Sequence, residues 1–149
     1  MNYLNKKNKG FTLIEILVVI GIIAILAAIV IVAINPKKHF DDAIAAQRDA
    51  NVNTILNAIG QYIVDNKGGL PTIPTANGGE IDEALCNTLV PEYVGAMPTD
   101  PQGDFDGAVI TDGDCDNITT TLKVGYNVDE ASDRVTVCSA IDPAICVTR

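Results

Sequence analysis

The feature that most restricts the fold of this chain is a long apolar run near its beginning. From Ile16 to Ile34 the sequence holds nineteen residues without a charged side chain. A helix over residues 11–34 would be roughly 36 Å long at about 1.5 Å per residue, which is enough to cross the ~30 Å hydrocarbon core of a bilayer. β-branched residues dominate the run, but a lone strand in lipid cannot satisfy its backbone hydrogen bonds. We therefore expect a membrane-spanning helix.

Charge is distributed unevenly on either side of this run. Three basic residues precede it, Lys6, Lys7 and Lys9, whereas residues 68–149 carry three basic and fourteen acidic side chains, a net charge of −11. Basic residues that flank a membrane helix tend to stay in the cytoplasm. We therefore expect a single-pass protein of the cytoplasmic membrane with an acidic head outside it. A head with no basic cluster offers little to a phosphate backbone, so nucleic acid is not an expected partner.

Glu15 is an ionisable residue close to the start of the apolar run. Such a residue costs about 2.5–3.5 kcal/mol at the centre of a membrane helix and therefore usually has a partner. A cleaved secretory signal peptide is one alternative for this end of the chain, and a plain membrane anchor is another. A signal peptide has an apolar stretch of only ~7–15 residues that ends at a small-residue cleavage site. The run here is longer, and Ile34-Asn35-Pro36 does not match such a site.

The segment Lys9-Gly10-Phe11-Thr12-Leu13-Ile14-Glu15, followed by the apolar run, resembles the class III signal and N-terminal helix of type IV prepilins and type II secretion pseudopilins. The resemblance implies that residues 1–10 are a leader, that a membrane prepilin peptidase cuts after Gly10, and that Phe11 is then N-methylated. It also implies that Glu15 meets the Phe11 amine of its own or a neighbouring chain during assembly. Because a buried carboxylate without a partner is disfavoured, Glu15 would favour the correct register.

Asn35-Pro36 interrupts the apolar run, and we expect a kink or a short unwound stretch at Pro36. Beyond it, apolar residues recur mostly at three- or four-residue steps, which predicts an amphipathic second half of the helix over residues 35–67. Lys67-Gly68-Gly69 supplies its end. His39 lies beside Lys37 and Lys38, just outside the expected membrane boundary, and is interpreted as an interfacial polar residue.

Residues 68–149 are expected to form a compact acidic head. Helical spacing predicts a short helix over residues 80–89, and alternation predicts strands at 122–128, around Val135 and Val137, and around Ile145 and Val147, with a weaker one at 108–111. Three or four antiparallel strands with one apolar face would pack on the amphipathic half of the long helix. The predicted fold class is α+β, and the resemblance implies the same pilin-like arrangement.

The four cysteines allow three pairings, and an exported head lies where disulfides can form. Cys138 lies on the strand face opposite Val135 and Val137, and Cys146 lies opposite Ile145 and Val147. A turn about Asp142 would bring these two thiols level, so we favour Cys138–Cys146, which leaves Cys86–Cys115. The alternative is that one or more thiols stay reduced. Zinc is not expected, because the sequence has no C-x₂-C spacing.

Alternating acids at Asp112, Asp114 and Asp116 could converge on a hard cation such as Ca²⁺, although the segment does not match an EF-hand. The segment Pro98–Gly103 resembles one in major pseudopilins, and the resemblance implies calcium in a nearby loop. Solvated acidic loops are the other interpretation, and no other cofactor is expected. No pair of carboxylates is set on rigid elements around an apolar cleft, so we expect no enzyme activity.

Taken with the resemblance, these patterns predict a structural subunit of a type IV pilus, a homopolymer whose helices form the filament core. The resemblance implies membrane storage before assembly, extraction by an ATP-driven machine of the inner membrane, and an extracellular filament that serves adhesion or motility. Two alternatives share the same N-terminal motif. One is a pseudopilin of a type II secretion system, and the other is a minor tip pilin for adhesion or DNA uptake, the latter disfavoured by the −11 head.

Overall fold

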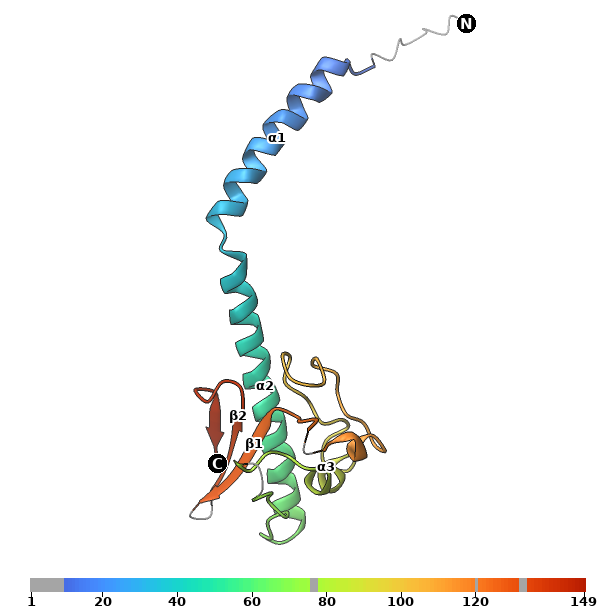
Figure 1. Ribbon diagram of the computed structural model, residues 1–149, viewed down its shortest axis with the longest axis vertical. Helices are drawn as coiled ribbons and strands as arrows, with labels where there is room; N and C mark the ends of the chain where they lie inside the picture. Colours follow the sequence, from blue (N-terminus) through green and yellow to red (C-terminus); the bar gives the residue numbers. More distant parts are fainter. Residues whose placement is uncertain (1–9, 76–77, 120, 132–133) are drawn as a thin grey trace, which may run out of the picture. The chain divides into compact units, whose positions relative to one another are not determined.

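The computed structural model describes residues 10–75, 78–119, 121–131 and 134–149. The predicted basic leader residues Lys6, Lys7 and Lys9 lie outside the described residues. The chain divides into two compact units, one that runs to Phe40 and one that spans Asp41–Arg149 (Figure 1). The first unit contains an apolar helix, and the second is an α+β head with its own core.

Helix α1 (Leu13–Ala33) occupies most of the apolar run. It is long and apolar enough to cross a membrane, with a mean hydropathy of 3.5. None of its residues is buried within the chain. The helix predicted over residues 11–34 is therefore present, and its first residue is Leu13.

An interruption at Ile34 and Asn35 separates α1 from helix α2 (Pro36–Asp65). Pro36 takes the first position of α2, where its missing N–H leaves no helical hydrogen bond unmade. Asn35 Oδ1 accepts a hydrogen bond from the Lys38 N–H at 3.4 Å, which satisfies one of the free donors of the new helix. The interruption thus lies at Ile34 and Asn35, immediately before Pro36.

Helix α2 ends where the sequence predicted. Lys67 and Gly68 both adopt left-handed backbone conformations, with φ of 55° and 92°. The Gly68 N–H reaches back to the carbonyl of Ile63 at 2.8 Å, which satisfies one of the last carbonyls of the helix. The helix therefore ends in two consecutive left-handed residues, although one left-handed glycine would be enough to end it. A left-handed lysine is less usual than a left-handed glycine.

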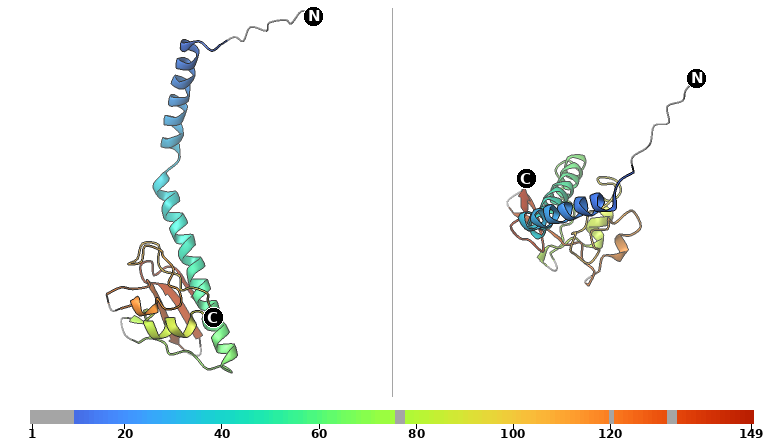
Figure 2. Two further views of the ribbon diagram at one scale, coloured as in Figure 1. Left: turned by 90° about the vertical axis from the view of Figure 1, so that its right-hand side faces the viewer. Right: turned by 90° about the horizontal axis from the view of Figure 1, so that it is seen from above.

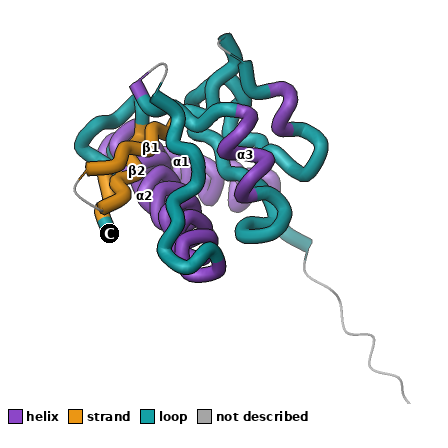
Figure 3. The backbone as a smooth tube through the Cα atoms, turned by 90° about the horizontal axis from the view of Figure 1, so that it is seen from below, coloured by secondary structure: helices purple, strands orange, loops and turns teal. Residues whose placement is uncertain are grey.

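The second half of α2 buries one face in the head. The strands and the short helix α3 (Glu83–Leu89) lie on the same side of α2 (Figure 2). Seen from the end of the head, α2 runs beside the strands (Figure 3). The buried α2 side chains that join the common core are Val52, Ile55, Leu56, Ala58 and Ile59.

Three antiparallel strands form the sheet in the order β1 (Tyr126–Ala131), β2 (Arg134–Ser139) and β3 (Cys146–Thr148). Val128 pairs with Val137, and Val137 pairs with Val147, so one face of the sheet is apolar and turned toward the core. The predicted antiparallel sheet on an amphipathic helix is confirmed with three strands.

Three predicted boundaries were wrong. The strand expected over 122–128 begins only at Tyr126, because the Val124 carbonyl accepts a hydrogen bond from the Asp100 N–H and not from a neighbouring strand. The same strand continues to Ala131, three residues past its predicted end at Val128. The weak strand at 108–111 is a single bridge between Met97 and Ile110.

The short helix expected over 80–89 is also shorter than predicted. Glu80 forms an isolated bridge with Asn127, and the Ile81 N–H donates to the Tyr126 carbonyl at 3.0 Å, so both residues are extended. Asp82 then caps the helix by accepting from the Leu85 N–H at 2.9 Å. The first two residues of the predicted helix, Glu80 and Ile81, therefore pair with β1 instead. The helix α3 begins only after the capping residue Asp82.

Candidate processing and assembly site

The predicted cleavage junction lies just before the first helical residue. Gly10, Phe11 and Thr12 have no helical or strand structure, and all three are exposed. Space is open around Gly10, where an added Cβ would meet no atom within 4 Å. An extended, accessible peptide is what a peptidase can take into its active site, and here it stands immediately before the helix that would be retained.

Glu15 is held at the start of α1 by a reciprocal pair of hydrogen bonds with Thr12. The Glu15 N–H donates to Thr12 Oγ1 at 3.3 Å, and the Thr12 N–H donates to Glu15 Oε2 at 3.5 Å. This capping box satisfies two backbone donors that a helix start leaves free. Sequence reasoning singled out Glu15 but missed Thr12, although the T-x-x-E spacing before an apolar run is the signal for this cap.

The rest of α1 presents apolar side chains to its surroundings on every side. Its isoleucines, leucines and valines are exposed, from 47% for Val19 to 87% for Val32. A helix that is apolar all round is stable only when it is surrounded by lipid or by other helices. Since α1 has no buried residue, no described part of this chain supplies that cover.

A buried ion pair fastens the head to α2. Arg48 Nε donates to Asp100 Oδ2 at 2.7 Å, and a guanidinium NH₂ group donates to Asp100 Oδ1 at 3.0 Å. Arg48 is 6% exposed and Asp100 is 0% exposed. The hydrogen bond to Asp100 raises the pKa of the Arg48 guanidinium, so Arg48 keeps its positive charge. Gln102 accepts a further hydrogen bond from Arg48 at 3.0 Å.

Neighbouring polar groups complete this attachment of Pro98–Gly103 to the helix. Asn51 Nδ2 donates to the Thr99 carbonyl at 3.1 Å and to the Tyr126 hydroxyl at 2.9 Å. Burial raises the pKa of the Tyr126 phenol, which keeps it neutral in the core. Gly125 stands so close that an added Cβ would lie 2.6 Å from the Asp100 Cβ.

Sequence reasoning found the segment Pro98–Gly103 but not its partner. Arg48 was not among the residues that the sequence singled out. A charged residue inside such a stripe is rarely buried unless it is paired, and that rule was the available signal. The partner itself, 52 positions away, could not be inferred from spacing.

Both disulfides have the predicted pairing. Cys86 of α3 is bonded to Cys115 in the short 3₁₀ helix η2 (Cys115–Asn117), and Cys138 is bonded to Cys146 across the antiparallel pair of β2 and β3. The first bond closes 29 positions of chain, and the second closes 8. The alternating faces of the two strands thus identified the correct partners.

The aspartates proposed for calcium do not gather into a site. In the part of the chain that the structure describes, no group of three His, Cys, Asp or Glu side chains is placed to hold a metal ion. Asp112, Asp114 and Asp116 are all exposed. Asp114 accepts a hydrogen bond from the Thr111 hydroxyl instead. The three aspartates are thus not brought together in the described residues, and calcium binding by this loop stays a prediction.

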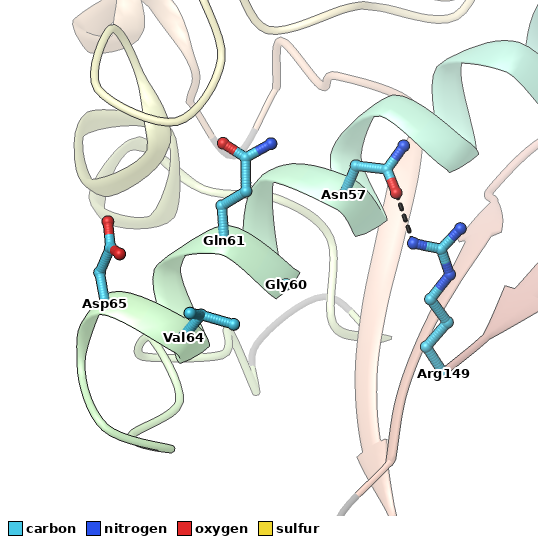
Figure 4. Close-up of a pocket in the computed structure, with 6 residues that line it drawn as sticks. All are labelled: Asn57, Gly60, Gln61, Val64, Asp65 and Arg149. Atoms are coloured by element: carbon cyan, nitrogen blue, oxygen red, sulfur yellow. Dashed lines mark hydrogen bonds between the residues drawn. The ribbon is translucent and has the colours of Figure 1, made fainter.

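A pocket of about 480 Å³ lies on the outer side of α2 near the end of the sheet. Figure 4 shows Arg149 reaching from the strand side toward Asn57, whose Oδ1 accepts its hydrogen bond. The other lining residues all lie on α2 and are Gly60, Gln61, Val64 and Asp65. Arg149 also pairs through its backbone with Val135, so it ties the edge of the sheet to the helix.

Comparison with known proteins agrees with this arrangement. The family model "Prokaryotic N-terminal methylation motif" matches residues 5–31. The chain is 34% identical over 105 residues to type II secretion system core protein G of Escherichia coli (strain K12), covering 65% of this chain and 68% of that protein. It is 33% identical over 108 residues to the protein of the same name from Aeromonas hydrophila, covering 66% of this chain and 70% of that protein. No solved structure matches the chain.

The aligned 105 residues far exceed the 27 residues of the motif (5–31), so the similarity to the secretion protein extends into the head. Three features occur together in this chain. They are the methylation motif, an exposed apolar helix preceded by an accessible Gly-Phe junction, and a small α+β head that includes the second helix. The chain belongs to the family of type IV pilins and type II secretion pseudopilins.

Proposed function

We propose that this chain is a pseudopilin, a structural subunit of a type II secretion system. The observation that carries the proposal is its similarity to two type II secretion core proteins G over about two thirds of each chain. The methylation motif alone would fit a type IV pilus subunit equally well, which is the function that the sequence patterns predicted first. Similarity beyond the motif supports the pseudopilin, because the two proteins that share it are named as type II secretion proteins.

In this proposal the prepilin peptidase cuts after Gly10 and methylates the amine of Phe11. The methylated amine keeps its positive charge and stands at the start of a helix that is surrounded by apolar groups. Glu15 then supplies the opposite charge, within the same chain or from a neighbouring one. An unpaired carboxylate in such surroundings is strongly disfavoured, so subunits that dock out of register are penalised.

Helix α1 holds the subunit in the cytoplasmic membrane before assembly, and other copies replace the lipid around it afterwards. The exposed apolar surface of α1 is suited to both environments. The energy for extraction comes from a separate inner-membrane machine. The assembled filament is then a short periplasmic one rather than a long extracellular pilus.

Secretion in the native organism tests this function directly. Deletion of the gene should leave exported proteins trapped in the periplasm, and the intact chain supplied in trans should restore their release. Mass spectrometry of the membrane-bound subunit should give an N-terminus at methylated Phe11. Normal secretion in the deletion strain, together with loss of long surface filaments, would contradict the proposal and favour a type IV pilus subunit.

The role of Glu15 can be separated from processing. Glu15→Ala should leave cleavage after Gly10 intact, because the junction itself is unchanged, but it should lower the yield of filaments. Cross-linking and electron microscopy of overexpressed filaments measure this yield, with Asp65→Ala as a control that removes an exposed carboxylate elsewhere. Normal filament numbers in cells that express only Glu15→Ala would rule out the register role.

A further inference from the structure

A short basic and aromatic segment follows the apolar helix. It consists of Lys37, Lys38, His39 and Phe40, here named the collar, and all four residues are exposed. Phe40 is 70% exposed, which is unusual for a phenylalanine in water. Among the described residues neither collar lysine forms an ion pair; the two pairs present are Arg48–Asp100 and Lys123–Glu80. The collar thus presents two lysines that form no ion pair with any described residue, together with an exposed aromatic ring.

The length of α1 determines where the collar lies relative to a membrane. Its 21 residues span roughly 32 Å at about 1.5 Å per residue. That length matches the ~30 Å hydrocarbon core, and only three residues separate Ala33 from Lys37. When α1 spans the bilayer, the collar consequently lies at the level of the lipid headgroups on the outer side. Lysine and aromatic side chains are the ones that favour this level.

The order of charges along the chain fits an anionic surface. The two lysines come first after the apolar helix, and Asp41 and Asp42 follow one helical turn later. The cations are thus nearest to the lipid phosphates and the carboxylates are further out in water. Basic residues on the outer side also oppose the orientation that Lys6, Lys7 and Lys9 favour, and they therefore make insertion less favourable. A favourable contact of the collar with the outer surface would offset this cost.

From this placement we propose that the collar binds the phosphates of anionic phospholipids in the outer leaflet and holds the subunit at a fixed depth until it is extracted. Lys37 and Lys38 contact the phosphates, and the ring of Phe40 lies among the lipid headgroups. The inference requires only that α1 spans the membrane. It holds for a pseudopilin and for any other member of the family.

Lipid selectivity of the full chain tests the proposal. The protein is placed in phosphatidylcholine vesicles that contain trace spin-labelled phosphatidylglycerol or spin-labelled phosphatidylcholine, and electron spin resonance gives the relative association of each with the protein. Each lysine near the surface should favour the anionic lipid about fivefold. The variant Lys37→Gln/Lys38→Gln should lose most of this preference, whereas Lys67→Gln, which changes a lysine just after the C-terminal end of α2, should keep it. The leader lysines contribute equally to all three proteins.

A second measurement reports depth. Because the chain contains no tryptophan, Phe40→Trp introduces a single probe in the collar. Its emission should shift to the blue when phosphatidylglycerol is added to the vesicles, and the shift should disappear when both lysines are replaced. Equal lipid association in the native chain and in Lys37→Gln/Lys38→Gln, or a tryptophan emission that ignores anionic lipid, would overturn the proposal. If the pseudopilin function is wrong, the deletion strain will secrete normally, and the lipid measurements will not be affected.

Discussion

Helices α1 and α2 follow one another in the chain but differ in where their side chains find partners. α1 has no buried residue, whereas α2 buries an apolar stripe and one arginine. The apolar groups of α1 must therefore be covered by lipid or by other subunits, and those of α2 are covered by the head of the same chain. We therefore expect substitutions in α1 to affect insertion and assembly, and substitutions in α2 to affect folding of the head.

The largest effect on folding is expected at the buried ion pair. Arg48→Met should lower the free energy of unfolding by about 3–5 kcal/mol, because Asp100 is left buried and charged without its partner. Urea unfolding of the full chain in detergent micelles, followed by tyrosine fluorescence, measures this change, since Tyr62, Tyr93 and Tyr126 lie in the head.

Two further variants isolate the cause. Lys123→Met removes a cation from the half-exposed pair with Glu80 and should cost at most about 1 kcal/mol. Asp100→Asn, added to Arg48→Met, should recover part of the loss, because the amide oxygen can still accept the Gln102 N–H without a buried charge. A double variant less stable than Arg48→Met would show that the unpaired charge is not the source of the loss.

A matched pair of isoleucines compares the two helices directly. Ile55 in α2 is 0% exposed and Ile23 in α1 is 58% exposed. Ile55→Ala should lower the free energy of unfolding of the head by about 2–5 kcal/mol, while Ile23→Ala should leave it unchanged. Ile23→Ala should act on filament yield instead. The comparison of the two helices fails if both substitutions destabilise the head equally.

The two disulfides should differ in their contribution to stability. A crosslink constrains the unfolded chain more when it closes a longer loop, so replacing Cys86 and Cys115 by alanine should cost about 3 kcal/mol. Replacing Cys138 and Cys146 should cost less, because that bond closes only 8 positions between strands that are already paired. Urea midpoints of the two double variants provide the measurement, and the reverse order would contradict this account.

The sequence could predict the elements that depend on local geometry, but it could not predict contacts between residues far apart in the chain. The length of the apolar run located α1. The 3.6-residue and two-residue periods follow from local geometry, and they located α2, the three strands and the pairing of Cys138 with Cys146. The Arg48–Asp100 pair joins residues 52 positions apart, and no period carries information about such a contact. The early start assigned to α3 failed for a similar reason, since Glu80 and Ile81 pair with β1 residues far along the chain.

Substitutions of glycine should change the free energy of unfolding least, and they also compare α1 with α2. An added Cβ at Gly60 in α2 meets no atom within 4 Å, so Gly60→Ala should raise the free energy of unfolding by about 1 kcal/mol through helix propensity alone. Gly125 has φ +88° and lies against Asp100, so Gly125→Ala should lower stability by about 1–3 kcal/mol. Gly21→Ala in α1 also meets open space, yet it should leave the urea midpoint of the head unchanged, because α1 does not take part in that unfolding transition. A shift for Gly21→Ala as large as that for Gly60→Ala would show that the two helices unfold together, and the separation of folding from assembly would then have to be abandoned.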